Sequence, residues 1–136
     1  LKGITIPRQH APRMIDEYPI LSIAASVAKG QSKFEGIGEL RVKESDRLSA
    51  MATGLEACGI NTHATSDSLI IDGTKEIPKG GITLDSLLDH RIAMSYLVLG
   101  LITKEPVTIK DSKPIETSFP GFIDLMNRIG ANMETI

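Results

Sequence analysis

Apolar residues follow helical spacing in three long segments of the chain. Residues 18–30 and 90–102 are apolar on nearly every face, which is typical of helices enclosed by other elements. Gly30 is expected to end the first of them. Residues 45–59 instead carry one apolar stripe, which consists of Leu48, Met51, Ala52, Leu55 and Cys58. The pattern predicts two buried helices with an amphipathic helix between them.

Shorter apolar runs predict strands, and polar runs predict loops. The expected strands are residues 1–6, 33–37, 61–64, 68–71, 107–110 and 132–135, of which 61–64 and 68–71 form a hairpin. Residues 7–13 are expected to be a basic loop and residues 72–85 an irregular stretch rich in Gly, Lys and Pro. A last helix is expected from a cap at Ser118, with Pro120 at its start, to a stop at Gly130.

The order of these elements contains a repeat. Asp16 precedes the first buried helix and Asp89 the second, and a strand residue follows 18 positions later in both, Phe34 and Val107. Each copy continues with an amphipathic helix and a Gly-x-Asn turn, which fits a repeated supersecondary unit. We therefore divide the chain into two units, about 1–72 and 73–136, of a mixed α/β (α+β) fold.

Composition restricts the class of protein only broadly. A chain of 136 residues with 41% hydrophobic residues is long enough for a compact domain. Its net charge of −2 gives no basic field for nucleic acid or a membrane surface, so neither partner is expected. One cysteine, Cys58, is compatible with a reducing compartment, and we expect a cytoplasmic location. Because the chain begins at Leu1, we expect it to be part of something longer.

Charge is concentrated in the octet Arg41-Val42-Lys43-Glu44-Ser45-Asp46-Arg47-Leu48, at the start of the amphipathic helix. A helix N-terminus favours anions, and Arg41, Lys43 and Arg47 are expected to strengthen such a site. Ser45 is expected to cap the helix. Glu44 would place a proton-transfer group among these cations, which points to chemistry on a small anionic substrate. The alternative is a solvated first turn with weak ion pairs.

Two further charged clusters precede the buried helices. Asp16 and Glu17 precede the first, and Asp16 taken alone is more readily a helix cap than a general base. Asp89, His90 and Arg91 stand at the start of the second, where an arginine is unfavourable unless an anion meets it. The three histidines are scattered and Cys58 lies on an apolar stripe, so no metal site is expected.

Together these motifs resemble the 5-enolpyruvylshikimate-3-phosphate synthase family (3-phosphoshikimate 1-carboxyvinyltransferases). The resemblance lies in four ordered segments, residues 14–30, 41–59, 88–94 and 117–120. It implies a two-domain enzyme in which each domain has three βαβαββ-type units around buried parallel helices, as an inside-out α/β barrel. This chain would supply about two units of the C-terminal domain, and substrates would bind in the cleft facing the missing N-terminal portion.

The resemblance also implies an activity and a set of site residues. The family transfers the enolpyruvyl group of phosphoenolpyruvate to the 5-hydroxyl of shikimate 3-phosphate, releases phosphate and needs no metal or organic cofactor; this step belongs to the shikimate pathway to chorismate and the aromatic amino acids. Asp16 would be the base at that hydroxyl, Lys43 would assist it, and Glu44 would exchange a proton with the phosphoenolpyruvate methylene carbon. The substrate-binding residues would be Asp16, Lys43, Arg47, His90 and Arg91.

Two positions depart from the pattern of some family members. Thr117 replaces a lysine that meets the leaving phosphate, so this role is expected to pass to Lys113 or to the missing part. Glu39 replaces an asparagine that contacts shikimate 3-phosphate. Two alternatives stay open: the sister transferase that acts on UDP-N-acetylglucosamine through a cysteine-bearing loop, and a non-catalytic anion-binding domain. The chain alone is expected to be inactive.

Overall fold

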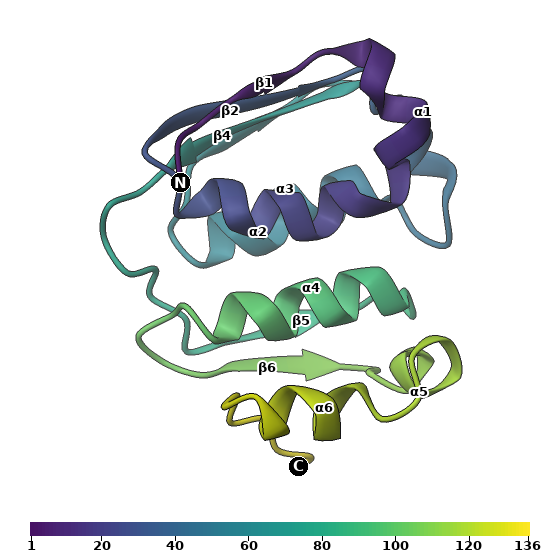
Figure 1. Cartoon of the computed structure of the whole chain (residues 1–136), viewed down its shortest axis with the longest axis vertical. Coiled ribbons are helices and arrows are strands. Elements are labelled where there is room, and N and C mark those ends of the chain that lie inside the picture. The colour runs from purple at the N-terminus through teal and green to yellow at the C-terminus, as the bar shows by residue number, and fades with distance from the viewer.

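The computed structural model describes residues 1–136 and contains two separate sheets. The four-stranded sheet has the order β1 (Thr5–Ile6), β2 (Gly30–Glu35), β4 (Ser68–Gly73) and β3 (Thr62–Ala64). The second sheet pairs β5 (Ile82–Asp85) with β6 (Val107–Lys110). Helices α2 (Tyr18–Ser26), α3 (Arg47–Ala57) and α4 (His90–Gly100) lie between the sheets (Figure 1).

Each buried helix connects two parallel strands. β1 pairs with β2 at Ile6 and Phe34 and is joined to it through α2, while β5 pairs with β6 at Ile82 and Val107 and is joined to it through α4. Parallel neighbours require such a crossover, and a helix is the usual solution. The predicted hairpin of β3 and β4 is also present. The strand–helix–strand unit therefore occurs twice, although β5, the strand that opens the second copy, lies in a segment predicted to be irregular.

The helices share one apolar core with both sheets. The predicted stripe of α3 is confirmed, because all five of its residues are buried. At Gly54, an added Cβ would collide with the ring of Tyr96, whose hydroxyl donates a hydrogen bond to the carbonyl oxygen of Ala50. This close approach fixes α4 against α3 and thereby fixes the relative position of their N-terminal ends.

The two apolar helices differ in how far they are enclosed. On α4, residues Ile92, Ala93, Tyr96 and Leu99 are all buried. On α2, Ile20 is 38% exposed, so one face of this helix is open, in contrast to the prediction. Its end was also predicted too late: α2 ends at Ser26, and Gly30 (φ +91°) begins β2. No helix in the chain is long and apolar enough to cross a membrane.

Two segments predicted to be loops contain regular structure. The basic segment is a series of helical turns: η1 (Arg8–His10), α1 (Ala11–Met14) and η2 (Ile15–Glu17). Pro12 in the first turn of α1 fits this outcome. The segment predicted as irregular ends in β5. The apolar pattern of this strand is short, and the Gly- and Pro-containing residues before it are typical of a loop, so the strand was not predicted.

The C-terminal region also differs from the prediction. Ser118 closes one short helix, α5 (Pro114–Ser118), and does not cap the last one, α6 (Phe122–Arg128). Gly121 (φ +76°) separates the two, a conformation that favours glycine. Residues 132–135 form no strand. The Asn127 side chain binds both the N–H and the carbonyl oxygen of Met133, at 2.8 and 2.9 Å, and so ties this segment to α6.

Candidate active site

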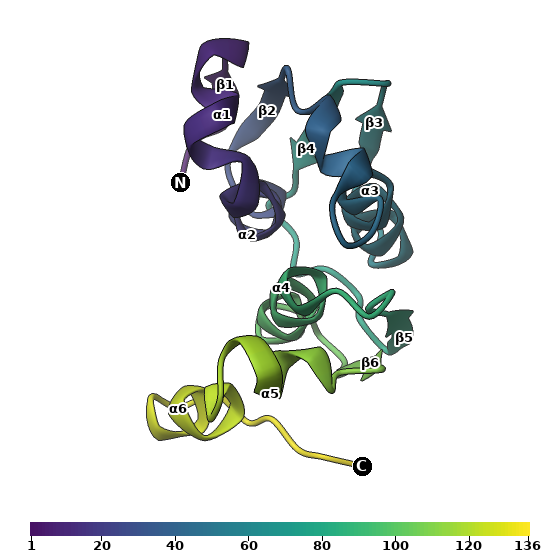
Figure 2. The same cartoon turned by 90° about the vertical axis from the view of Figure 1, so that its right-hand side faces the viewer.

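The N-terminal ends of α2, α3 and α4 lie at the same end of the molecule, on the right of Figure 1 and facing the viewer in Figure 2. Each end carries one of the three charged clusters seen in the sequence. The turn η2 places Asp16 before α2, and η3 (Gly38–Val42) leads into Lys43 and Glu44 before α3. Asp89 stands directly before α4. The fold thus brings together charged residues that are far apart in the sequence.

Arg47 is the centre of this arrangement. It is the first residue of α3, and only 1% of its side chain is exposed. Its guanidinium contacts three carboxylates: Nε lies 2.8 Å from Asp89, Nη1 lies 3.0 Å from Asp16, and Nη2 pairs with Glu44. Burial favours loss of the proton, but the carboxylates, led by Asp89, outweigh it and raise the pKa of Arg47. A permanently charged guanidinium, which uses each of its three nitrogens once, therefore fixes three acids.

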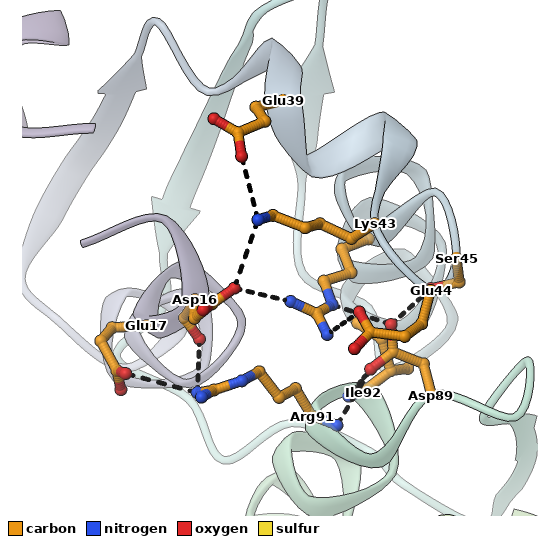
Figure 3. Close-up of polar contacts among 10 residues, drawn as sticks. Asp16, Glu17, Glu39, Lys43, Glu44, Ser45, Asp89, Arg91 and Ile92 are labelled. Carbon is orange, nitrogen blue, oxygen red and sulfur yellow. Dashed lines mark hydrogen bonds and ion pairs between the residues drawn. The ribbon is translucent and has the colours of Figure 1, made fainter. Parts of the chain in front are cut away.

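Lys43 lies beside the same acids. Figure 3 shows its ammonium group between Glu39 and Asp16, at 2.9 and 3.8 Å respectively. The hydrogen bond to Glu39 is the main cause of a raised pKa for Lys43, which holds the proton on this side chain at neutral pH. Lys43 is therefore a cation and hydrogen-bond donor next to the Asp16 carboxylate.

Arg91 closes the cluster from the side of α4. Its Nη1 donates to the main-chain oxygen of Asp16 at 2.9 Å and lies 3.3 Å from the Glu17 carboxylate (Figure 3). About a third of the Arg91 side chain remains exposed, more than for Lys43 or Arg47. His90, the first residue of α4, is half-buried and takes no part in these contacts.

The structure thus brings five of the six sequence-predicted site residues into contact, which are Asp16, Lys43, Glu44, Arg47 and Arg91. With Glu17, Glu39 and Asp89 they form what we call the charged cluster. It contains five carboxylates against three cations. Every cation already has a carboxylate partner, so the cluster holds its acids in place and does not form an unfilled anion site.

Two expectations for the octet are wrong. Arg41 points away from the charged cluster: it pairs with Asp46 at 2.7 Å and donates to Ser49 and to the main-chain oxygens of Thr65 and Ser66. Asp46 caps α3 by accepting the N–H of Ser49, so Ser45 is not the cap. The side chain of Asp46 therefore already provides the anion that the N-terminus of α3 favours.

The sequence singled out Asp89 only as an acid before a helix. In the structure it is completely buried and accepts the N–H groups of Arg91 and Ile92 at 3.0 and 3.4 Å. Ser45 donates to the same carboxylate at 3.0 Å. An acid directly before a helix is a common cap, so the sequence could have indicated the contacts with the N–H groups of Arg91 and Ile92. The contact with Arg47, 42 positions away, had no sequence signal.

Two acids in this region predict a dependence of stability on pH. Burial alone would raise the pKa of Asp89, but the bond and charge of Arg47 outweigh it and lower the pKa. Burial would also raise the pKa of Asp46, but hydrogen bonds from Ser49 and Arg41 outweigh this effect and lower the pKa. Both carboxyls have a pKa of about 3.9 in an unfolded chain. Their stabilisation is therefore present above about pH 4 and is lost as the pH falls through the lower folded values.

We expect the urea midpoint of unfolding to fall steeply below about pH 4. Urea titrations from about pH 7 to about pH 3 will measure it. The variant Asp46→Asn should show a shallower fall, because one of the two titrating groups is gone. A midpoint that stays constant across this range would contradict the assignment.

The remaining candidate chemistry finds no support here. Cys58 is buried directly after α3, and burial raises the pKa of its thiol, which makes it an inert packing residue. The chain contains no group of three or more His, Cys, Asp or Glu side chains placed to hold a metal ion. Lys113 and Thr117, at α5, are both exposed.

Comparison with known proteins places this chain in a family. Residues 2–126 match the family described as EPSP synthase (3-phosphoshikimate 1-carboxyvinyltransferase). A 3-phosphoshikimate 1-carboxyvinyltransferase of Rhodospirillum rubrum is 56% identical over 136 residues, which is all of this chain and 30% of that protein. The protein of the same name from Cereibacter sphaeroides is 55% identical over 133 residues, or 98% of this chain and 30% of that protein.

Solved structures agree. An EPSP synthase from Acinetobacter baumannii superposes with a TM-score of 0.94 and 46% identity over 98% of this chain and 31% of that one. The enolpyruvyl transferase NikO from Streptomyces tendae, at 20% identity over 97% of this chain and 29% of that one, shares the fold with a TM-score of 0.71. This chain spans about a third of the length of these relatives. It belongs to the EPSP synthase family and has that family's inside-out α/β fold.

Proposed function

We propose that this chain forms one wall of an enzyme that transfers the enolpyruvyl group of phosphoenolpyruvate to the 5-hydroxyl of shikimate 3-phosphate and releases phosphate. The observation that carries the proposal is the charged cluster at three converging helix ends, in a chain 56% identical to a 3-phosphoshikimate 1-carboxyvinyltransferase. Residues 1–72 and 73–136 would be two units of the C-terminal domain. The remaining portion of the enzyme would face the cluster.

The proposed roles follow the contacts of each acid. Asp16 would remove the proton of the 5-hydroxyl, since Arg47 and Lys43 hold its Oδ1 from one side and 44% of its side chain stays exposed. Glu44 would give a proton to the methylene carbon and take one back, since Arg47 orients it and 52% of it is exposed. Acid and base would thus be anchored to one buried guanidinium, which keeps their spacing constant.

Substrate binding would fall to Lys43, Arg47, His90 and Arg91. Arg91 is the most exposed of the three cations, so it would be the first to exchange a carboxylate partner for a substrate anion. The five carboxylates of the cluster oppose the approach of two anionic substrates. We therefore expect the facing portion of the enzyme to supply further cations. The burial of Cys58 gives no support to the alternative that relies on a reactive cysteine.

A chimera tests the proposal. This chain would replace the aligned segment of the Rhodospirillum rubrum relative, and phosphate release from phosphoenolpyruvate and shikimate 3-phosphate would be measured. We expect turnover within about tenfold of the parent enzyme, because the facing wall is restored. The isolated chain should release no phosphate. A folded chimera without turnover would reject the proposal in favour of a non-catalytic anion-binding domain.

A further inference from the structure

Asp89 connects the two repeated units at the charged cluster. It belongs to the second unit, but it contacts Ser45 and Arg47 of the first. Its carboxylate is fully buried, and both oxygens are used by different partners. A buried carboxylate with four donors is fixed in orientation, because any rotation would leave a charged or polar group unpaired.

The two oxygens serve separate purposes. Oδ1 accepts the N–H groups of Arg91 and Ile92 and so caps α4. Oδ2 accepts Nε of Arg47 at 2.8 Å and the hydroxyl of Ser45 at 3.0 Å. One carboxylate therefore ties the start of α4 to the guanidinium that holds Asp16 and Glu44.

The contact at Nε decides where the rest of the guanidinium points. The guanidinium is planar, so an acceptor fixed at Nε sets the plane and leaves Nη1 and Nη2 directed at other partners. Those partners are Asp16 and Glu44, the acids proposed to transfer protons. Both are about half exposed and would otherwise be mobile, whereas Arg47 and Asp89 are buried.

We propose that Asp89 is a positioning residue for the reaction, which orients Arg47 and through it sets the spacing of Asp16 and Glu44. This inference rests on the proposed function for its kinetic consequence, but not for its structural one. The competing explanation is that Asp89 is only a helix cap. Asparagine and serine cap helices about as well as aspartate, so replacing Asp89 by either keeps the cap and removes the carboxylate.

The structural half is tested on the full 136-residue chain by NMR. The Nε–H proton of Arg47 should exchange slowly with water in the wild-type chain, whereas that of the exposed Arg13 should exchange fast. In Asp89→Asn the Arg47 signal should shift and its protection should be lost. An Arg47 proton that exchanges as fast as that of Arg13 in the wild-type chain would already overturn the proposal, whether or not the variant folds.

The kinetic half is tested in the chimera with three variants. We expect Asp89→Asn and Asp89→Ser to lower kcat by about 10- to 100-fold with a much smaller change in KM, because small misplacements of reacting groups slow the chemical step. Asp46→Asn is the matched control: Asp46 also caps a helix and pairs with an arginine, but outside the cluster. It should lower thermal stability and leave kcat within about twofold.

The outcomes separate the two claims. If the chimera has no turnover but Asp89→Asn releases the Arg47 signal, the proposed function fails and the orienting contact is upheld. If the chimera is active and both Asp89 variants keep kcat while folding normally, the positioning role is rejected and the proposed function stands. A kcat loss of equal size in Asp46→Asn would also reject it, since a general loss of stability would then explain the effect.

Discussion

Replacing Glu44 by glutamine should lower kcat of the chimera by about 10²- to 10⁴-fold, the usual contribution of a general acid or base. Glutamine keeps the shape of the side chain and its carbonyl oxygen can still accept from Arg47, but it cannot give up and recover a proton. Stability should change little, because the Glu44 carboxylate is about half exposed and exposed ion pairs contribute weakly. The loss should therefore appear in kcat, with KM nearly unchanged.

Two measurements check this result. Incorporation of solvent deuterium into the phosphoenolpyruvate methylene group reports the proton exchange directly and should stop in Glu44→Gln. The control is Glu56→Gln, since Glu56 is an exposed glutamate of α3 whose side chain has Thr62 as its only polar partner. Its kcat should match that of the parent chimera. Wild-type deuterium incorporation in Glu44→Gln would assign the proton to another group.

Sequence analysis predicted well the elements whose pattern lies within one segment or between segments that are neighbours in the chain. The stripe of α3 is a local pattern, and the hairpin of β3 and β4 joins neighbours in the chain. The errors occur where tertiary contacts overrule local signals. Residues 132–135 have a strand-like pattern, but Asn127 binds the main chain of Met133 and no strand forms. The partner of β5 is β6, and α4 lies between the two strands in the chain. No local hairpin signal therefore predicted β5.

For the charged cluster, the sequence singled out five of its residues but not the partners that they contact. Asp16, Lys43, Glu44, Arg47 and Arg91 do converge, because the repeat places similar charged helix entrances at one end of the fold. The charge pattern alone suggested free cations awaiting an anion. Burial of Arg47 changes this interpretation, since a buried cation requires carboxylates. Burial depends on α4 packing against α3, which no single segment of sequence shows.

Replacing Arg47 by methionine should destabilise the chain by about 3–5 kcal/mol, the usual cost of removing one partner of a buried ion pair. Asp89 is completely buried and would be left without its cationic partner. Methionine fills a similar volume, so the loss is mainly electrostatic and not a packing effect. Urea unfolding of the wild-type and variant chains at neutral pH measures the difference.

Arg41→Met is the matched control for this loss. The Arg41 side chain makes four polar contacts against three for Arg47, but its carboxylate partner, Asp46, is 39% exposed and can be solvated when the arginine is removed. The control should therefore lose no more than about 1–2 kcal/mol.

Adding Asp89→Asn to Arg47→Met should recover part of the stability, because the buried carboxylate without a cationic partner is removed while the helix cap is kept. The recovered protein should still lack turnover in the chimera, since Asp16 and Glu44 have lost their common anchor. A double variant no more stable than Arg47→Met would show that the buried charge of Asp89 is not the source of the loss.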